Sequence, residues 1–446
     1  MKSIWIRVLG TALGILALSG FFGAPAYGQS LRIYHIDVEQ ADATLIVSPS
    51  GTSLLVDSGK NGHGSRLKAI MDQAGVTQID FFVCTHYHED HYGGIDDLVN
   101  DEGITVVNAF DRGEKDQLSD TKRSQVTFVD YENAVGNRAV HLVRGDTIPL
   151  DDPRTTVTCI ASGGIVIGED SPVVGDSEND KSIALLIEFQ GFRYVIGGDI
   201  EVTTEGKIAT SDLALDVDIY QANHHGSHTS SSLAFLTDLQ PRVVIISNGN
   251  HGGFQHPRQH TLDTLAGLSP APTVFQTNKY HKGGLGGNVP DEFIADLEST
   301  DRDGTILVTV TVTPSTRQYV VSYTDEARPF PIKPRIDVPV TIVIESLLPD
   351  PEKNDRIFES VTLKNKSDDS VSLSSWTLRD KGGKSWSLVS LGDIGPGESK
   401  RIVRNGMPMS LNNKGDTITL FGPGNQKRDT FTYPNSRKGV SISTGH

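Results

Sequence analysis

Cysteine is scarce in this sequence, with only Cys84 and Cys159 among 446 residues. Two thiols cannot build a disulfide framework, which excludes the small, disulfide-rich class of secreted domains. Each cysteine lies in a run of apolar and β-branched residues that is typical of a buried strand. We therefore expect two buried core thiols rather than a bridge, although export would permit one.

Long hydrophobic runs are lacking beyond the first residues. Leu9–Phe22 is apolar but too short and too rich in glycine to cross a membrane. It follows Lys2 and Arg7 and precedes the small residues of Ala24–Gly28, which predicts a cleaved secretory signal over residues 1–28. No cysteine lies near the cleavage site, so a lipoprotein anchor is not expected. We expect a secreted or periplasmic protein without a transmembrane segment.

Positive charge is in short supply over the first three quarters of the chain. The formal net charge is −16. From residue 331 onward the sequence holds 17 Lys and Arg against 13 Asp and Glu, so the acidic excess lies entirely before that point. An acidic region repels a polyphosphate backbone unless metal ions or local basic groups offset it. This balance argues against a tight nucleic-acid binder but not against an enzyme that turns DNA over.

The length that remains after the predicted signal suits two domains. Over residues 29–325, short apolar runs alternate with helical spacing, which predicts an α/β domain. The expected strands cover residues 31–36, 43–47, 52–56, 79–84, 182–189, 194–196 and 243–246, the helices residues 65–74, 232–239 and 261–268, and a closing hairpin residues 305–323. Clustered prolines over 326–339 predict an extended linker. Residues 340–440 show short alternating strands between turns, which predicts a small all-β sandwich.

Three imidazoles and two carboxylates fall within six residues, directly after the apolar run Ile79–Cys84. The order H-x-H-x-D-H behind such a run places metal ligands at the carboxyl end of a buried strand. Imidazole with one carboxylate suits Zn²⁺ and, less often, iron or manganese. The spacing lets His86 and His88 meet one ion while Asp90 and His91 meet a second. We expect two Zn²⁺ ions, with Mn²⁺ as the alternative, and a surface turn as the less favoured interpretation.

Two later segments can complete such a site. The run Val195–Asp199 ends in a carboxylate whose two oxygens can bridge two ions, although an ordinary turn aspartate is the alternative. Further on, His224 and His225 are adjacent, and either can complete the ligands of the second ion. We favour His225 slightly over His224.

Hydroxyl groups and another histidine follow. Ser227 begins a run of serine and threonine that ends at Ser232, where a helix is predicted to start. Backbone amides and hydroxyls there suit a phosphate or another oxyanion, and plain capping of the helix is an equal alternative. His256 follows a Gly-rich loop and is suited to protonating a leaving group or binding substrate, with a surface histidine as the alternative.

The order of these motifs resembles the metallo-β-lactamase superfamily, which carries H-x-H-x-D-H, a later strand-end Asp and a later His. Within it, residues 31–325 are similar to the exported hydrolase domain of competence DNA-uptake channel proteins. The segments that carry the likeness are Ile36–Ala43, Leu55–Gly59, His86–Gly94, Asn179–Ser182, Gly197–Glu201, His224–Ser227 and Gly252–Pro257. The resemblance implies a four-layer αββα sandwich with the metals at one edge of the sheets.

The resemblance also implies roles for individual residues. It gives His86 and His88 to the first ion, Asp90, His91 and His225 (or His224) to the second, and Asp199 to both. It places Asp57 where the superfamily keeps a carboxylate that orients a ligand histidine, and Asp42 on a loop that approaches the site. The histidine that usually completes the first ion's ligands is missing just before Ser182, where Glu178, Asn179 and Asp180 are the candidates. A single ion is therefore an alternative.

Residues 340–440 resemble the lamin-tail domain. The segments that carry this likeness are Phe358–Asn365, Val371–Asp380, Ile394–Gly397 and Asn413–Leu420. The resemblance implies an immunoglobulin-like sandwich of the kind often appended to exported nucleases and hydrolases, and we expect it to bind a polymer, a protein or a cell surface. Its Trp376 and Trp386 are expected to pack in the domain rather than form a ligand platform.

Together these features predict an exported metal-dependent hydrolase, most simply a phosphodiesterase or nuclease that cleaves DNA through attack by a metal-bound hydroxide. The expected catalytic residues are Asp90, Asp199, Ser227 and His256. One alternative is a hydrolase of another ester, such as a phosphocholine or lactone esterase, because this fold hosts several hydrolytic chemistries. The other is a non-catalytic binding protein, motivated by the missing histidine.

Overall fold

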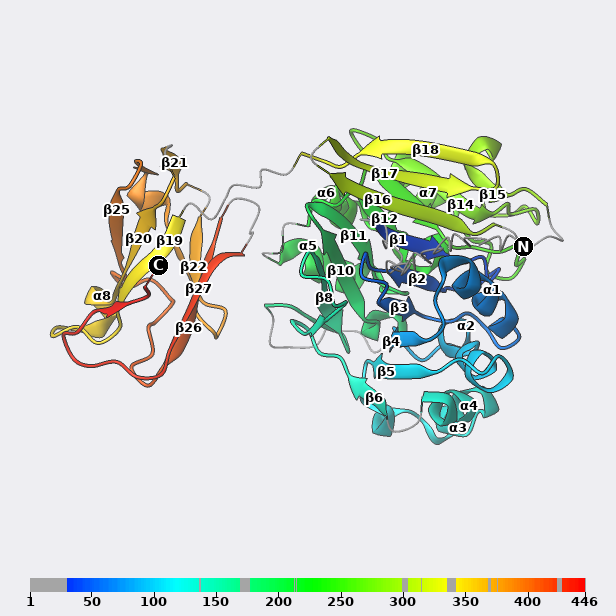
Figure 1. Ribbon diagram of the computed structural model, residues 1–446, viewed down its shortest axis with the longest axis horizontal. Helices are drawn as coiled ribbons and strands as arrows, with labels where there is room; N and C mark the ends of the chain where they lie inside the picture. The colour runs from blue at the N-terminus through cyan, green and yellow to red at the C-terminus, as the bar shows by residue number, and fades with distance from the viewer. Residues whose placement is uncertain are drawn as a thin grey trace, which may run out of the picture.

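The computed structural model describes residues 30–135, 138–168, 177–211, 213, 215–298, 304–313, 315–334, 342–367, 370–374, 376–422 and 427–445. The signal predicted over residues 1–28 lies outside the described residues. Figure 1 shows a larger body of sheets and helices, followed in sequence by a smaller body of strands. In the described part of the chain, no helix is long and apolar enough to span a membrane.

The first sheet of the larger body has the strand order β18-β17-β16-β1-β2-β3-β4-β5-β6. Its strands are β1 (Ser30–His35), β2 (Thr44–Val47), β3 (Ser53–Val56), β4 (Ile79–Val83), β5 (Val106–Asp111), β6 (Ala139–His141), β16 (Ile306–Thr313), β17 (Thr316–Tyr323) and β18 (Glu326–Pro331). Successive side chains of a strand point to opposite faces of the sheet. In β16, Ile306, Val308 and Val310 therefore point into the interior, and the intervening residues are partly exposed.

The second sheet has the order β15-β14-β13-β12-β11-β10-β8-β7, with β9 paired to β8. Its strands are β7 (Thr147–Ile148), β8 (Thr155–Ser162), β9 (Ile165–Val166), β10 (Ala184–Phe189), β11 (Phe192–Ile196), β12 (Ile219–Gln221), β13 (Val243–Ile246), β14 (Thr273–Asn278) and β15 (Ile294–Asp296). Strands β11 to β15 run parallel. Their carboxyl ends therefore meet at one edge of the sheet, where the chain leaves β11 and β12 to form the site described below.

Helices cover the outer faces of both sheets, which gives four layers (Figure 1). They are α1 (Gly64–Ala74), α2 (Glu89–Tyr92), α3 (Asp120–Arg123) and α4 (Val126–Val135) in the first half, and α5 (Val202–Thr210), α6 (Leu233–Leu239) and α7 (Gln259–Ala266) in the second. One core lies between the sheets, and one lies between each sheet and its helices. Helix α1 buries Leu67, Met71 and Ala74 on one face and ends at Gly75, whose φ of 73° suits glycine. The predicted αββα sandwich is confirmed.

The strands and helices predicted for this body begin and end within two residues of their observed bounds. The predicted linker over 326–339 is wrong at its start. Glu326–Pro331 forms β18, which pairs antiparallel with β17. Its prolines are tolerated because β18 is an edge strand, where missing N–H groups break no interior ladder. Ile332 then joins the core between the sheets, and the Lys333 amide donates to Asp218. Residues 335–339 lie outside the described residues.

The two cysteines are free and buried, as predicted. Cys84 directly follows β4, and Cys159 lies within β8. Burial raises the pKa of the Cys159 thiol to about 12. Both are core thiols.

The smaller body contains two four-stranded sheets, β25-β20-β19-β28 and β23-β22-β26-β27, and the pair β21-β24. Its elements are β19 (Ile342–Leu348), α8 (Asp355–Phe358), β20 (Ser360–Asn365), β21 (Val371–Ser372), β22 (Thr377–Arg379), β23 (Ser385–Ser387), β24 (Asp393–Ile394), β25 (Ser399–Val403), β26 (Asp416–Phe421), β27 (Lys427–Tyr433) and β28 (Ile442–Ser443). Trp376 and Trp386 are buried in its core, and the Trp386 indole donates to the Met409 carbonyl at 2.9 Å. The all-β prediction and the packing role of both tryptophans are confirmed.

Gly94, which follows α2 and the H-x-H-x-D-H motif, packs closely against the loop that follows β3. A Cβ at Gly94 would lie 2.2 Å from the Ser58 carbonyl oxygen, so Gly94→Ala must push the two segments apart. We expect the variant to lose about 1–3 kcal/mol of unfolding free energy, measured by urea unfolding of the full chain. The matched control is Gly206→Ala in α5, where a Cβ meets nothing within 4 Å. That variant should be unchanged or up to about 1 kcal/mol more stable, and equal stability of the two variants would contradict the close approach.

Candidate metal centre

The side chains of the predicted site come from loops at the ends of strands in both sheets. His86 and His88 follow β4, and Asp90 and His91 lie on the short helix α2. Asp199 follows β11, and the turn after β12 carries the two adjacent histidines. Residues far apart in sequence are thus brought to one edge of the two stacked sheets.

Asp199 is the centre of this cluster, and its two carboxylate oxygens face different pairs of imidazoles. Its Oδ1 lies 3.3 Å from His91 Nε2 and 3.9 Å from His225 Nε2. Its Oδ2 lies 3.8 Å from His86 Nε2 and 3.7 Å from His224 Nε2. One carboxylate placed between two sets of nitrogen donors is an arrangement that suits a pair of neighbouring cations.

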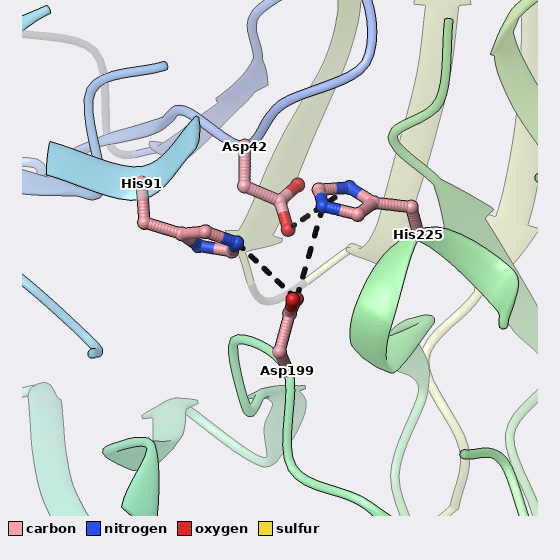
Figure 2. A group of neighbouring side chains, drawn as sticks. All are labelled: Asp42, His91, Asp199 and His225. Atoms are coloured by element: carbon pink, nitrogen blue, oxygen red, sulfur yellow. Dashed lines mark ion pairs between the residues drawn. The ribbon is translucent and has the colours of Figure 1, made fainter. Parts of the chain in front are cut away.

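One set of donors consists of Asp42, His91, Asp199 and His225, all buried, with ligand atoms within 4.8 Å of one another. Figure 2 shows these side chains pointing toward a common centre. Three of the atoms, His91 Nε2, His225 Nε2 and Asp199 Oδ1, are buried and have no hydrogen-bond partner. Orphaned buried polar atoms are rare and cost about 1–3 kcal/mol each. A cation among them would satisfy all three, so these residues fit a metal ion.

The second set is His86, His88 and Asp199, again within 4.8 Å. His86 Nε2 and His88 Nδ1 lie 2.9 Å apart, so both nitrogens face the same space. His224 approaches the same oxygen of Asp199 as His86 does. The structure therefore places the two adjacent histidines on opposite sides of Asp199, whereas the sequence offered them as alternatives for one ion.

Asn179 lies beside this second set. It is one of the three residues, with Glu178 and Asp180, that the sequence offers where the expected histidine is missing. Its Nδ2 is 3.5 Å from His224 Nδ1, and its Oδ1 is buried without a hydrogen-bond partner. An amide oxygen and an additional imidazole are therefore close to the set that lacks its usual histidine.

Hydrogen bonds behind the cluster fix the imidazole tautomers. Asp57 accepts from the Thr85 amide and hydroxyl, both at 2.8 Å, and from His91 Nδ1 at 2.7 Å. The Ser247 carbonyl, which can only accept, takes a hydrogen bond from His225 Nδ1 at 3.1 Å. In both rings Nδ1 thus carries a proton, and Nε2 is the nitrogen left to bind a cation. Asp57 has the orienting position that the resemblance implied.

Asp42 lies on the loop between β1 and β2, which was expected to approach the site, and its side chain reaches the cluster. Its Oδ1 accepts from Gln221 Nε2 at 3.0 Å, and its Oδ2 lies 3.6 Å from His225 Nδ1. Asp90 flanks the same ring, with Oδ2 3.5 Å from His225 Nε2. Both carboxylates are therefore within reach of an ion held by His225.

The turn that carries the two histidines is held in an unusual backbone conformation. His224 and His225 have φ values of 52° and 53°, in the left-handed region that side chains other than glycine rarely adopt. Hydrogen bonds of the preceding residue hold the turn in place. The Asn223 amide donates to the Tyr220 hydroxyl, and the Asn223 side chain donates to the Glu205 carboxylate, both at 2.8 Å. Strain of about 1–3 kcal/mol per residue persists only where the surroundings enforce it, and such strain clusters at functional sites.

The buried carboxylates give the cluster a strong preference for positive charge. Burial raises the pKa of Asp42 to about 7. Burial alone would lower the pKa of His225, but Asp42, Asp199 and Asp90 outweigh it and raise that pKa to about 9. The His225 shift has the direction expected of a site that attracts positive charge, whereas the Asp42 shift reflects the cost of burying its carboxylate.

His256 is not a surface histidine, since it is 4% exposed. Its ring stacks on that of His225 with centroids 6.1 Å apart, and its Nδ1 is 3.3 Å from Gln40 Nε2. Burial and the neighbouring imidazoles lower the pKa of His256 to about 3. Its position against a cluster histidine suits packing and orientation.

Ser227 lies behind the other histidine. Its hydroxyl is 3.1 Å from that of Thr229, which is 3.0 Å from His224 Nδ1. The chain of hydroxyls ends on the ring of His224, so Ser227 acts on the cluster through Thr229.

The predicted oxyanion site at the start of α6 is wrong, and so is the alternative of a serine cap. The amides of Ser231 and Ser232 donate to the buried carboxylate of Glu205 at 2.6 and 2.7 Å. The Ser232 side chain makes no capping hydrogen bond. A carboxylate from α5 thus occupies the amides that a phosphate would need, and nothing in the local sequence indicated it.

A second structural group that the sequence did not reveal is the buried side chain of Arg112. It forms two hydrogen bonds with Glu178, at 2.8 and 2.7 Å, and lies 4.5 Å from the ring centroid of Tyr87. Glu178 also accepts from the Tyr87 amide at 2.8 Å. This clamp ties the H-x-H loop to the segment that carries Asn179.

The Asp57–His91 hydrogen bond generates a prediction about metal affinity. Asp57→Asn removes the charge that holds the His91 tautomer, and we expect zinc affinity to fall by about ten- to a hundredfold, measured by competition with a chromophoric chelator. The control is Asp80→Asn at the opposite end of β4, where the carboxylate accepts from the Ser53 amide at 2.8 Å. Zinc affinity that falls equally in both variants would mean that Asp57 acts through folding alone.

The division around Asp199 predicts a metal stoichiometry. The wild-type chain should bind two zinc ions, and His88→Ala and His225→Ala should each retain one, because each removes a donor from one set. Elemental analysis of the dialysed proteins gives the count. Loss of both ions in either variant, or two retained ions in both, would contradict two separate sets.

Comparison with known proteins agrees with this architecture. Residues 52–247 match the beta-lactamase superfamily domain, and residues 338–435 match the lamin tail domain. ComE operon protein 3 of Bacillus subtilis is 25% identical over 260 residues, which cover 54% of this chain and 31% of that protein. Recombination protein 2 of Haemophilus influenzae is 24% identical over 274 residues, covering 59% and 30%. The chain spans about a third of the length of these curated relatives.

Similar solved structures include one hydrolase and one zinc-bound protein, both of low sequence identity to this chain. The isothiocyanate hydrolase from Delia radicum gut bacteria is 13% identical, with a TM-score of 0.34, covering 57% of this chain and 97% of that one. Zn²⁺-bound PqqB from Methylobacterium extorquens is 15% identical, with a TM-score of 0.33, covering 53% and 85%. From the two domain matches, this chain carries a metallo-β-lactamase superfamily domain followed by a lamin tail domain.

Proposed function

We propose that this protein is an exported, metal-dependent phosphodiesterase that cleaves DNA. The observation that carries the proposal is the position of Asp199, whose two oxygens face separate sets of imidazoles. Sites with two neighbouring ions are suited to displacement at phosphorus, because attacking and leaving oxygens both need stabilisation.

In this proposal each set of donors holds one ion. His86, His88 and Asp199 would hold the first, with His224 nearby, and Asp42, Asp90, His91, Asp199 and His225 surround the second. The bound ions would supply an activated water and stabilise the negative charge that develops on the phosphate. The chain itself orients the donors: Asp57 fixes His91, and the Ser247 carbonyl fixes His225.

Asp90 is the best placed of the predicted catalytic residues to handle a proton. Its side chain is 21% exposed, whereas that of Asp199 is 3% exposed, and it lies 3.5 Å from His225 Nε2. A carboxylate that reaches both the cluster and solvent can accept a proton from the attacking water and release it. His256 and Ser227 support the cluster histidines, His256 by packing on His225 and Ser227 through Thr229.

DNA as the substrate is supported by the relatives and by the resemblance to competence DNA-uptake proteins. One relative is named recombination protein 2, and the other is a ComE operon protein. The acidic charge of the catalytic region calls for cations wherever a phosphate backbone approaches, and the proposed ions would provide them. A secreted or periplasmic location belongs to the same proposal, as does a polymer, protein or cell surface as partner of the lamin tail domain.

The direct test is incubation of the purified chain with labelled single- and double-stranded DNA in the presence of zinc, manganese or chelator. We expect cleavage with metal and none with chelator. Asp199→Asn should reduce cleavage to the chelator background while the protein stays folded, because both sets of donors share this residue. Asp263→Asn, an exposed carboxylate on α7, is the matched control and should cleave as the wild type does.

The outcome also separates the alternatives. Hydrolysis of a lactone or phosphocholine ester without cleavage of DNA would favour an esterase. Full activity of Asp199→Asn would contradict the bridging role. If the wild-type chain neither binds metal nor hydrolyses any of these substrates, the result would favour a non-catalytic binding protein with the same fold.

A further inference from the structure

The loop between β13 and α7 exposes an aromatic ring close to the metal cluster. Phe254 is 47% exposed, although it stands only two residues before the buried His256. Single exposed apolar side chains are ordinary on protein surfaces and carry no meaning alone. Phe254 differs because two histidine rings lie next to it.

Phe254 belongs to a column of nearly parallel rings that ends in the metal cluster. Its centroid is 4.6 Å from that of the exposed His251, with planes at 32°. It is also 6.0 Å from the ring of His256, with planes at 28°. His256 in turn stacks on His225 at 6.1 Å and 23°. His251, at the exposed end of the column, is therefore three ring spacings from His225, a proposed metal ligand, and Phe254 is two.

The column is held in place by hydrogen bonds between its loop and a second loop. The His281 amide donates to the Asn250 side chain at 3.0 Å, and the Leu285 amide donates to Gln255 Oε1 at 2.9 Å. The Phe254 amide donates to His251 Nδ1 at 3.4 Å. The aromatic pair is thus fixed before any ligand arrives, which lowers the entropic cost of binding a flat group.

The second loop adds an apolar and a cationic side chain. Leu285 is 68% exposed. The exposed Lys282 runs along Gly252, where an added Cβ would lie 3.6 Å from Lys282 Cγ. Aromatic rings beside a basic group are the combination that binds single-stranded nucleic acid, because bases stack on rings and phosphates pair with cations.

We propose that His251 and Phe254 form a stacking surface for a nucleobase of a single strand whose phosphodiester lies at the metal cluster, with Lys282 near an adjacent phosphate. This inference rests on the proposed function and adds to it a preference for strands whose bases are unpaired near the cut. Stacking is tolerant of sequence, so the surface would select for the presence of a base rather than its identity.

The test compares two strands with the same backbone. The probes are a fluorescent phosphorothioate oligothymidylate and the same oligomer with abasic positions throughout, both titrated into the zinc-loaded full chain. Wild-type protein should bind the base-bearing probe roughly tenfold more tightly. Phe254→Ala should lose most of that difference while it keeps its zinc content. Phe358→Ala, which truncates an exposed phenylalanine of the lamin tail domain at 39% exposure, is the control and should retain the difference.

A second variant gives a readout that does not depend on affinity. Phe254→Trp keeps an aromatic face, and its emission should be quenched by the base-bearing probe and not by the abasic one. Equal binding of the two probes by the wild type, or an equal loss for both in Phe254→Ala, would overturn the stacking surface, as would unquenched emission.

The failures of this inference and of the proposed function are distinguishable. Cleavage of DNA by the wild type without quenching or dependence on Phe254 refutes the stacking surface alone. Quenching by the base-bearing probe without cleavage under any metal refutes the nuclease and leaves a site that binds bases. Absence of both results overturns both proposals.

Discussion

A buried negative charge at Asp199 is the constraint on which the site depends. A carboxylate taken out of water costs several kcal/mol unless opposite charge compensates it. Asp199 is buried, and the buried Asp42 and Asp57 lie close by. The neighbouring imidazoles compensate this charge only when they are protonated or when they share a cation with it. Because His91 and His225 use Nδ1 for hydrogen bonds behind the cluster, their Nε2 atoms remain available to a metal.

The αββα fold supplies this cluster from both halves of the larger body. The H-x-H-x-D-H motif comes from the end of a strand in the first sheet, and Asp199 and the two adjacent histidines follow strands of the second. A cation bound between them would add a further connection between the two halves, so metal binding would also stabilise the packing of the two sheets. The left-handed turn at His224 and His225 fits this account, since it aims two consecutive imidazoles at opposite oxygens of Asp199.

Features encoded locally were predictable from the sequence, and features set by distant contacts were not. The strand before His86, the hairpin over residues 305–323 and the helix over residues 65–74 follow from short-range periodicity, and the structure contains them. By contrast, the Glu205 carboxylate reaches the start of α6 only after α5 and α6 have packed. The proximity of Asp42 to His225 and the separate sides taken by His224 and His225 likewise depend on tertiary geometry. The edge strand β18 was hidden by its prolines, which indicate a linker unless the strand's partner is known.

The most direct test of two cations around Asp199 is crystallographic. Crystals of the zinc-loaded full chain, measured at wavelengths on either side of the zinc absorption edge, report the positions of bound zinc independently of activity. Two anomalous peaks are predicted, one beside His86 and His88 and one beside His91 and His225, with Asp199 between them. A zinc-loaded crystal with no peak within reach of Asp199 would contradict the account.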